Sequence, residues 1–448
     1  MEKNRGIIPS RTLSLVDAVS IIIGIVVGAG IFVFPSLVAS NVSSGQMLMM
    51  VWLAGGFISF IGALCYAELA TTYPDAGGDY HFLRNSYGNS ISFMFAWARM
   101  LIIQPGAIVM VAFIIGNELT RYMPVGEYSQ SIYAASIIIF LTIINAAGIR
   151  QGKMTQKFLS SAILLGLLVL IGIAFTSEPA REAVTAAEIS PEKTMAGLGM
   201  AMLFVLFTYS GWNESAYVSA EIKNPDRNII KSLLIGIGIV TVIYLLVNYG
   251  MFRVLGLEGM AQHGAQHGAP QKLIEVTFGS AYVPLISAIL LLAALSTTNA
   301  TILTGGRSNY ALGRNFRLFS FLGFWREKTG TPARGLIFQA FISLTLVLFG
   351  TFYSKSGLEA MVDYTSPAFW FFFLLVGISI FIFRNWDGER PRPFRVPLYP
   401  LTPLIFVVIC VYMLQNSLSY TGSGALVSVA VLIAAIPVIF INNRLLKK

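Results

Sequence analysis

The sequence has 448 residues and a formal net charge of +9, with 56% hydrophobic and only 11% charged residues. Soluble proteins carry about 25% charged residues, and a mean hydropathy of +0.73 does not fit a water-exposed surface. This composition excludes a soluble enzyme, a nucleic-acid-binding protein and a secreted disulfide scaffold. We expect one integral membrane domain over residues 1–448, with no catalytic residues.

Apolar runs long enough to cross a bilayer recur along the whole chain. A spanning helix needs about 20 apolar residues, and helices satisfy their own backbone hydrogen bonds in lipid. The sequence therefore predicts an all-α membrane protein with 12 transmembrane helices. The predicted spans are 13–40, 46–71, 89–119, 131–148, 156–176, 195–221, 229–254, 279–309, 333–351, 359–384, 398–417 and 423–443.

The distribution of basic residues predicts the orientation. An even number of spans places both termini on the same side, and the loops on that side hold 23 of the 30 Lys and Arg residues, against six on the other side. Because basic residues concentrate in cytoplasmic loops, we expect both termini in the cytoplasm and a multi-pass protein of the cell membrane. The two cysteines, Cys65 and Cys410, lie inside apolar runs, where they indicate packing.

Two spans contain an unusual cluster of glycine or polar residues near their middle. The first span contains three glycines within the segment Gly24–Phe32, and the sixth contains the segment Phe207–Glu214, with Ser210 and Gly211 at its centre. Glycine lowers helix propensity by about 1 kcal/mol relative to alanine, so each cluster is a candidate unwinding point. Close helix packing through small residues is the alternative explanation.

The position of the two clusters favours unwinding. They fall in the first and sixth spans, which open two successive groups of five. Many secondary transporters are built from two inverted five-helix repeats whose paired discontinuous helices form a site at the bilayer midplane. We therefore expect a first repeat over 13–176, a second over 195–384 and two additional helices over 398–443.

Short motifs then make a family recognisable. Gly28-Ala29-Gly30-Ile31-Phe32, followed by Pro35, resembles a signature of the amino acid–polyamine–organocation transporters, as do the segments 66–69 and 77–80. The segment 207–213 and its exit over 221–228 resemble the L-type amino acid transporter branch, and so does Ile103-Gln104-Pro105. The resemblance implies the architecture of the bacterial leucine transporter, a 5+5 inverted repeat with discontinuous helices 1 and 6.

An amino acid presents a carboxylate and an ammonium group to its site. A helix that restarts after a break offers free N–H groups and a positive dipole end, which bind anions. We therefore expect the amides of Gly28, Ala29 and Gly30 to bind the carboxylate. The resemblance implies further roles by position: carbonyls of Val26, Phe207 and Ser210 for the ammonium group, Phe207 as a gate, and Trp212, Asn213 and Gln104 around the substrate side chain.

The coupling ion is predicted from helices 5 and 8. Many relatives place a lysine in helix 5, and the matching position here is Ala162. The segment 293–298 is similar to the sodium-binding stretch of the leucine transporter. We therefore expect a Na⁺ site whose ligands are the carbonyl oxygens of Gly24, Val27 and Ala293 and the hydroxyls of Ser296 and Thr297. Hydroxyls that bond back to their own helix are the alternative.

Other charged residues have less specific interpretations. We expect Glu214 to lie in the outer vestibule, and we interpret Glu118 and Asp363 in the same way. The alternative for Glu214 is that it binds a cationic substrate side chain. Glu68 and Arg99 are predicted to form a structural ion pair on the cytoplasmic side, with a gate or proton relay as the alternative role of the pair. His263 and His267 have helical metal-ligand spacing, but their glycine neighbours indicate an extracellular loop.

These observations together predict a secondary active transporter of neutral L-amino acids that works by alternating access, with Na⁺ symport as the coupling. Sodium-independent exchange and proton coupling are the alternatives, and a channel or receptor is the rival from another class. The expected partners are a small-molecule amino acid and the lipid bilayer; no nucleic acid is expected, and an accessory subunit is left open. No cofactor is expected apart from a Na⁺ ion.

Overall fold

The computed structural model is helical throughout the part of the chain that it describes, which is residues 13–75, 77–179, 191–214, 216, 222–261, 268–326, 328–353, 357–420 and 423–446. The first half contains α1 (Leu15–Val26), α2 (Gly30–Ala39), α3 (Gly45–Thr72), α4 (Asp79–Tyr87), α5 (Asn89–Ala98), η1 (Arg99–Ile103), α6 (Gln104–Tyr122), α7 (Ser129–Ala147) and α8 (Ile149–Thr176). The second half contains α9 (Pro191–Tyr209), α10 (Pro225–Ala261), α11 (Ala269–Phe278), η3 (Ser280–Tyr282), α12 (Val283–Asn315), η4 (Arg317–Leu322), α13 (Ala333–Tyr353), α14 (Gly357–Trp386), α15 (Leu401–Tyr420) and α16 (Ser423–Leu446).

Every predicted span overlaps a helix. Among the described residues, nine helices are long and apolar enough to cross a membrane, and the bent pair α1 and α2 makes a tenth. The two other predicted spans fall at α8 and α9, whose side chains are described only from residues 161 and 197 onward. The prediction of a helical membrane protein is therefore confirmed at this coarser level.

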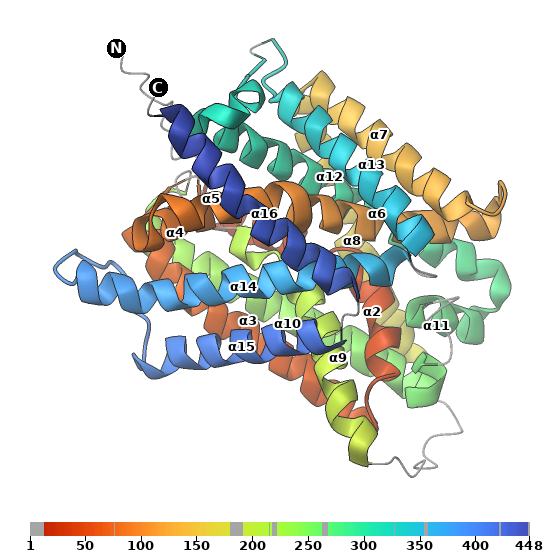
Figure 1. Cartoon of the computed structure of the whole chain (residues 1–448). Helices are drawn as coiled ribbons and strands as arrows, with labels where there is room; N and C mark the ends of the chain where they lie inside the picture. The colour runs from red at the N-terminus through yellow and green to blue at the C-terminus, as the bar shows by residue number, and fades with distance from the viewer. Residues whose placement is uncertain are drawn as a thin grey trace.

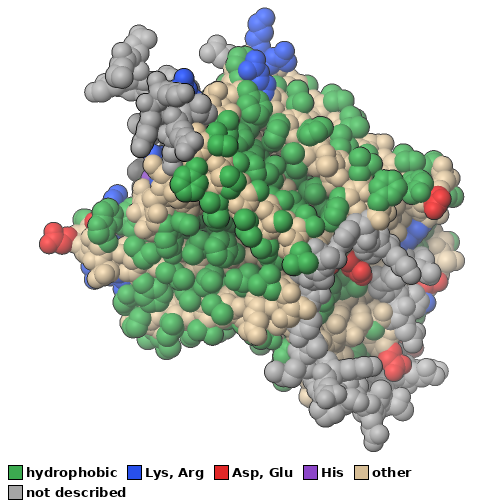
Figure 2. Space-filling model, viewed as in Figure 1, with side chains coloured by type: hydrophobic (Ala, Val, Ile, Leu, Met, Phe, Trp, Pro, Cys, Tyr) green, Lys and Arg blue, Asp and Glu red, His purple; other side chains and the backbone are tan. Residues whose placement is uncertain are grey.

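The surface is that of a protein surrounded by lipid. Large apolar side chains such as Phe57, Ile143, Leu285 and Phe352 are more than half exposed. In Figure 2, apolar side chains cover the broad face of the molecule, and the charged side chains lie near its rim. Lipid tails favour such a face, since burying charge in hydrocarbon is costly.

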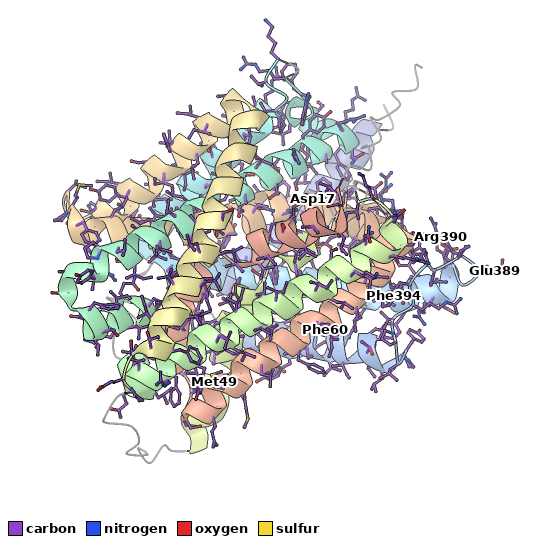
Figure 3. The ribbon with its side chains drawn as sticks, turned by 180° about the vertical axis from the view of Figure 1, so that it is seen from behind. Asp17, Met49, Phe60, Glu389, Arg390 and Phe394 are labelled. Carbon is purple, nitrogen blue, oxygen red and sulfur yellow. The ribbon has the colours of Figure 1, made fainter. Side chains whose placement is uncertain are left out.

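Small residues let the central helices approach one another. A Cβ atom added at Gly55 of α3 would lie 2.3 Å from Val205 of α9, and one added at Gly56 would lie 2.6 Å from Thr241 of α10. Such close approach increases van der Waals packing between membrane helices. Figure 3 shows α3, on which Met49 and Phe60 are labelled, running beside α10 (pale green), and α8 (yellow) packing against α10.

Two short helices were not predicted. α4 follows α3 through a turn, and α11 lies between α10 and α12 (Figure 1). The N–H of Ala269, the first residue of α11, donates to the Ser36 hydroxyl of α2 at 2.8 Å, so α11 covers one end of α2. His263 and His267 lie outside the described residues.

Candidate functional site

The first span is broken at its glycine cluster, as predicted from the sequence. A capping box between Ser14 and Asp17 starts α1, which ends at Val26, and α2 begins at Gly30 with a bend of 50° between the two helices. No side chain caps the start of α2, so its first N–H groups depend on other partners. The N–H of Ala29 lies 3.4 Å from the Thr297 hydroxyl of α12.

The sixth predicted span is broken as well. α9 ends at Tyr209, and Gly211 has a φ of 105°, which L-residues with a side chain rarely adopt. A short 3₁₀ turn over residues 212–214 follows. The two breaks touch, because a Cβ atom added at Gly211 would lie only 2.9 Å from the side chain of Ile25 in α1.

A tyrosine from a third helix joins the two breaks. The Tyr244 hydroxyl of α10 donates to the Val26 carbonyl at 2.9 Å and to the Thr208 carbonyl at 3.1 Å. Tyr244 is fully buried. Backbone carbonyls freed by a helix break need a partner in a membrane interior, and the Tyr244 hydroxyl serves one carbonyl from each break.

A cavity of about 180 Å³ lies between the breaks. Eight of the nine predicted substrate-binding residues line this cavity: Val26, Gly28, Ala29, Gly30, Gln104, Phe207, Ser210 and Asn213. The ninth, Trp212, lines a smaller neighbouring cavity and contacts Tyr66 edge-on, with 5.0 Å between the ring centroids. Phe207 stacks on Phe369 at 6.0 Å, so an aromatic wall faces the break in α1.

Some of the predicted carbonyl acceptors already have a partner. The Phe207 carbonyl accepts from the Ser210 hydroxyl at 2.7 Å and from the Ser210 N–H at 3.2 Å. The Val26 carbonyl accepts from Tyr244. A carbonyl oxygen has two lone pairs, so Val26 retains capacity for a substrate, whereas both acceptor positions of Phe207 are used.

The predicted sodium ligands lie in α12 and in α1 and the break that follows it. The Thr297 hydroxyl donates to the Ala293 carbonyl at 3.1 Å, as the back-bonding alternative described. The same oxygen is the acceptor nearest to the Ala29 N–H. Ala293 and Ser296 are buried in α12, Val27 is buried at the break, and Gly24 is half-buried in α1. The Ala29 N–H occupies one of the two lone pairs of the Thr297 hydroxyl oxygen, which leaves one for another partner.

A buried cluster of charges lies on the cavity wall. Arg99, at the start of η1, donates through one guanidinium nitrogen to both carboxylate oxygens of Glu214 at 3.0 Å, and its Nε donates to the Ser308 hydroxyl at 2.9 Å. Asp79, the first residue of α4, is 3% exposed and lines the same cavity. Sequence reasoning missed Asp79, because its motif was used only to identify the family.

Two sequence-based predictions about charges were therefore wrong. Arg99 does not pair with Glu68, because the bend after α9 brings Glu214 to the guanidinium group first. Glu214 is a partner of Arg99 at the cavity and not an open vestibule residue. Glu118 forms an ion pair with Arg121 one turn away, at 3.1 Å, and Asp363 is half-buried in α14.

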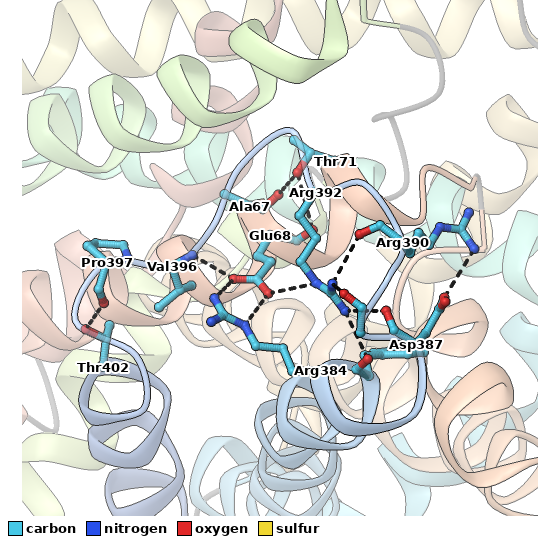
Figure 4. Close-up of polar contacts among 12 residues, drawn as sticks. Ala67, Glu68, Thr71, Arg384, Asp387, Arg390, Arg392, Val396, Pro397 and Thr402 are labelled. Atoms are coloured by element: carbon cyan, nitrogen blue, oxygen red, sulfur yellow. Dashed lines mark hydrogen bonds and ion pairs between the residues drawn. The ribbon is translucent and has the colours of Figure 1, made fainter.

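Glu68 instead ties α3 to the end of α14 (Figure 4). Its carboxylate accepts from the Arg384 guanidinium at 2.8 and 2.6 Å and from the Val396 N–H at 2.6 Å. Arg392 lies 3.6 Å from the same carboxylate. A carboxylate that is 3% exposed is stable only with such partners, and this arrangement fixes the 387–397 connector against α3.

Comparison with known proteins identifies the family of this chain. Residues 13–441 match the amino acid permease family. The b(0,+)-type amino acid transporter 1 of Mus musculus is 27% identical over 418 residues, which cover 90% of this chain and 82% of that protein. The Large neutral amino acids transporter small subunit 2 of Homo sapiens is 27% identical over 459 residues, which cover 98% of this chain and 81% of that protein.

Proposed function

We propose that this chain, which belongs to the amino acid permease family, moves neutral L-amino acids across the cell membrane by alternating access, independently of sodium. The observation that carries the proposal is the pair of facing helix breaks that line one cavity. A zwitterion needs donors for its carboxylate and acceptors for its ammonium group, and broken helices supply both from the backbone. Exchange of one amino acid for another and proton-coupled uptake are both compatible with this site.

In the proposed complex, the substrate carboxylate binds the N–H groups of Gly28, Ala29 and Gly30 at the start of α2, and the Ala29 N–H gives up its 3.4 Å contact with the Thr297 hydroxyl to do so. The positive end of the α2 dipole favours an anion at that point. The ammonium group binds the Val26 carbonyl and a carbonyl at Ser210. The rings of Phe207 and Phe369 then contact the substrate side chain, which supports a preference for apolar amino acids.

The architecture that goes with this function is also a proposal. We infer 12 spans arranged as two inverted repeats, 13–176 and 195–384, with α15 and α16 as the additional pair. The charge bias of the loops supports cytoplasmic termini. One relative is named a small subunit, so an accessory subunit is a candidate partner of this chain.

Sodium symport is the second candidate. The observation in its favour is the position of Ala293 and Thr297 beside the break at Ala29, where a cation could couple α1 to α12. Against it stands the contact of the Ala29 N–H with the Thr297 hydroxyl oxygen, which a bound Na⁺ would have to share or displace. The hydrogen bond that this hydroxyl donates to the Ala293 carbonyl uses its proton and leaves its lone pairs for other partners.

Counterflow in liposomes tests the proposal. Purified protein is reconstituted with an unlabelled neutral amino acid inside, and uptake of the labelled amino acid is measured in sodium-free buffer and in sodium buffer. We expect uptake in both buffers and no uptake by Gly30→Leu, whose side chain would fill the space beside Phe34 and Thr208. No counterflow of any amino acid would refute transport, and uptake only with sodium would establish the second candidate. Flux without counterflow would indicate a channel.

A further inference from the structure

The charged cluster on the cavity wall has an excess of negative charge. Asp79 and Glu214 supply two carboxylates, and Arg99 supplies the guanidinium group that lies between the elements carrying them. Arg99 is committed to Glu214 by two hydrogen bonds and to Ser308 by a third. The Oδ1 atom of Asp79 has no hydrogen-bond partner among the described residues. Among the residues that the structure describes, a second ionised carboxylate in this cluster would lack a matching cation.

The surroundings of Asp79 are polar in part, but among the described residues they bring no second cation. Tyr66 of α3 and Asn213 after α9 face the carboxyl, together with Arg99 and Glu214. α5 and α14, which also pack against α4, line the cavity with Phe95, Phe369, Phe372 and Phe373. Burial raises the pKa of Asp79 to about 7, and the nearby charge of Glu214 adds to this effect, while Arg99 and hydrogen bonds with Tyr66 and Asn213 partly offset it. Asp79 lies outside the membrane spans, between the span formed by α3 and the span formed jointly by α5, η1 and α6.

The local fold places the Asp79 carboxyl where a change in its charge would alter the Arg99–Glu214 ion pair beside the proposed substrate site. Arg99 begins a π-helical turn, η1, within the span made by α5 and α6, and such turns are frequent at functional sites. Glu214 lies four residues beyond Ser210, in the segment that carries the second break. The Arg99–Glu214 pair therefore links that segment to α12 through Ser308.

We propose that Asp79 is a proton-binding site and that the proton it takes up is coupled to the movement of the amino acid. The inference rests on the proposed transport function and deepens it. With a proton on Asp79, the cluster is neutral and Arg99 remains paired with Glu214. When the proton leaves, the Asp79 carboxylate competes with Glu214 for Arg99, which loosens the segment after the break and favours release of the substrate. One proton binds and one is released in each cycle.

The experiment uses the full chain in liposomes that contain a pH-sensitive dye. Addition of a neutral amino acid outside, without a pH gradient, is expected to acidify the lumen of wild-type liposomes. For a pKa near 7, the protonated fraction of Asp79 falls from about nine-tenths at pH 6 to about one-tenth at pH 8, so substrate affinity should fall several-fold over that range. Asp79→Asn mimics the protonated form and should abolish both acidification and the pH dependence.

Asp75→Asn is the matched control, because Asp75 lies four residues earlier, is about half exposed and pairs with His81 at 3.7 Å. It should retain wild-type proton movement. Wild-type counterflow without acidification and with pH-independent affinity would overturn the proton site but leave the transport function intact. An Asp79→Asn protein that still moves protons would also overturn it. So would an Asp79→Asn protein that changes only in its preference for lysine or arginine over neutral substrates. If Asp79→Asn does not fold, the wild-type measurements alone decide.

Discussion

The approach of Gly28, in the break of the first span, to Thr297 of α12 can be tested by adding a single methyl group at Gly28. A Cβ atom at Gly28 would lie 2.4 Å from the Thr297 hydroxyl oxygen, but 3.5 Å from the nearest Thr297 carbon atoms. Gly28→Ala should therefore clash with one atom, the hydroxyl oxygen. That oxygen is held by the Ala293 carbonyl and the Ala29 N–H, so it cannot move without losing hydrogen bonds.

The magnitude follows from these contacts. Overpacking a well-filled site costs about 1–3 kcal/mol, and removal of the Thr297 hydroxyl in Thr297→Ala costs about 0.5–1.5 kcal/mol. In the double variant the clashing oxygen is gone, so Gly28→Ala should cost much less than in the parent. We expect the two substitutions to be coupled by about 1–2 kcal/mol, in the sense that the double variant is more stable than the sum predicts.

The assay is thermal unfolding of all four proteins in detergent, together with counterflow in liposomes. Gly238→Ala is the matched control, because a Cβ atom there has no neighbour within 4 Å, and alanine favours a helix by about 1 kcal/mol over glycine. This control should be neutral or slightly stabilising. Additive effects in the cycle, or a Gly28→Ala protein as stable and active as the parent, would refute the contact between the break and α12.

Two other substitutions test contacts that hold the transport site in place. Tyr244→Phe removes the donor shared by the Val26 and Thr208 carbonyls and should destabilise the protein by about 1–3 kcal/mol. The control Tyr249→Phe, on the lipid-facing side of α10, should have no effect. Equal unfolding temperatures of the two variants would contradict the bridge. Glu68→Gln removes the negative charge that pairs with Arg384. Because Arg384 is partly exposed, we expect a loss of about 1–3 kcal/mol in the same unfolding assay. An unchanged unfolding temperature would show that the pair is dispensable.

The sequence alone was sufficient to predict the helical membrane fold and the position of both breaks. Hydropathy is a local property, so each span could be found from its own residues. The breaks were also local, because glycine at Gly28, Gly30 and Gly211 weakens a helix wherever it occurs. Family membership, predicted from short motifs, is confirmed by the match over residues 13–441.

The partners of the buried charges could not be predicted. Arg99 and Glu214 are 115 residues apart, and Glu68 and Arg384 are 316 residues apart. Which carboxylate meets which guanidinium group depends on how the helices cross, and no local pattern encodes that crossing. The bridge formed by Tyr244 was hidden for a similar reason, since one tyrosine in an apolar run looks the same whether it faces lipid or two broken helices.

The most direct test of the account is an experimental structure with a neutral amino acid bound. We predict density for the ligand in the cavity between the two breaks, with its carboxylate within hydrogen-bond distance of the N–H groups of Gly28 to Gly30. A ligand bound elsewhere, or a first span that runs as one unbroken helix through Val27 to Ala29, would contradict it.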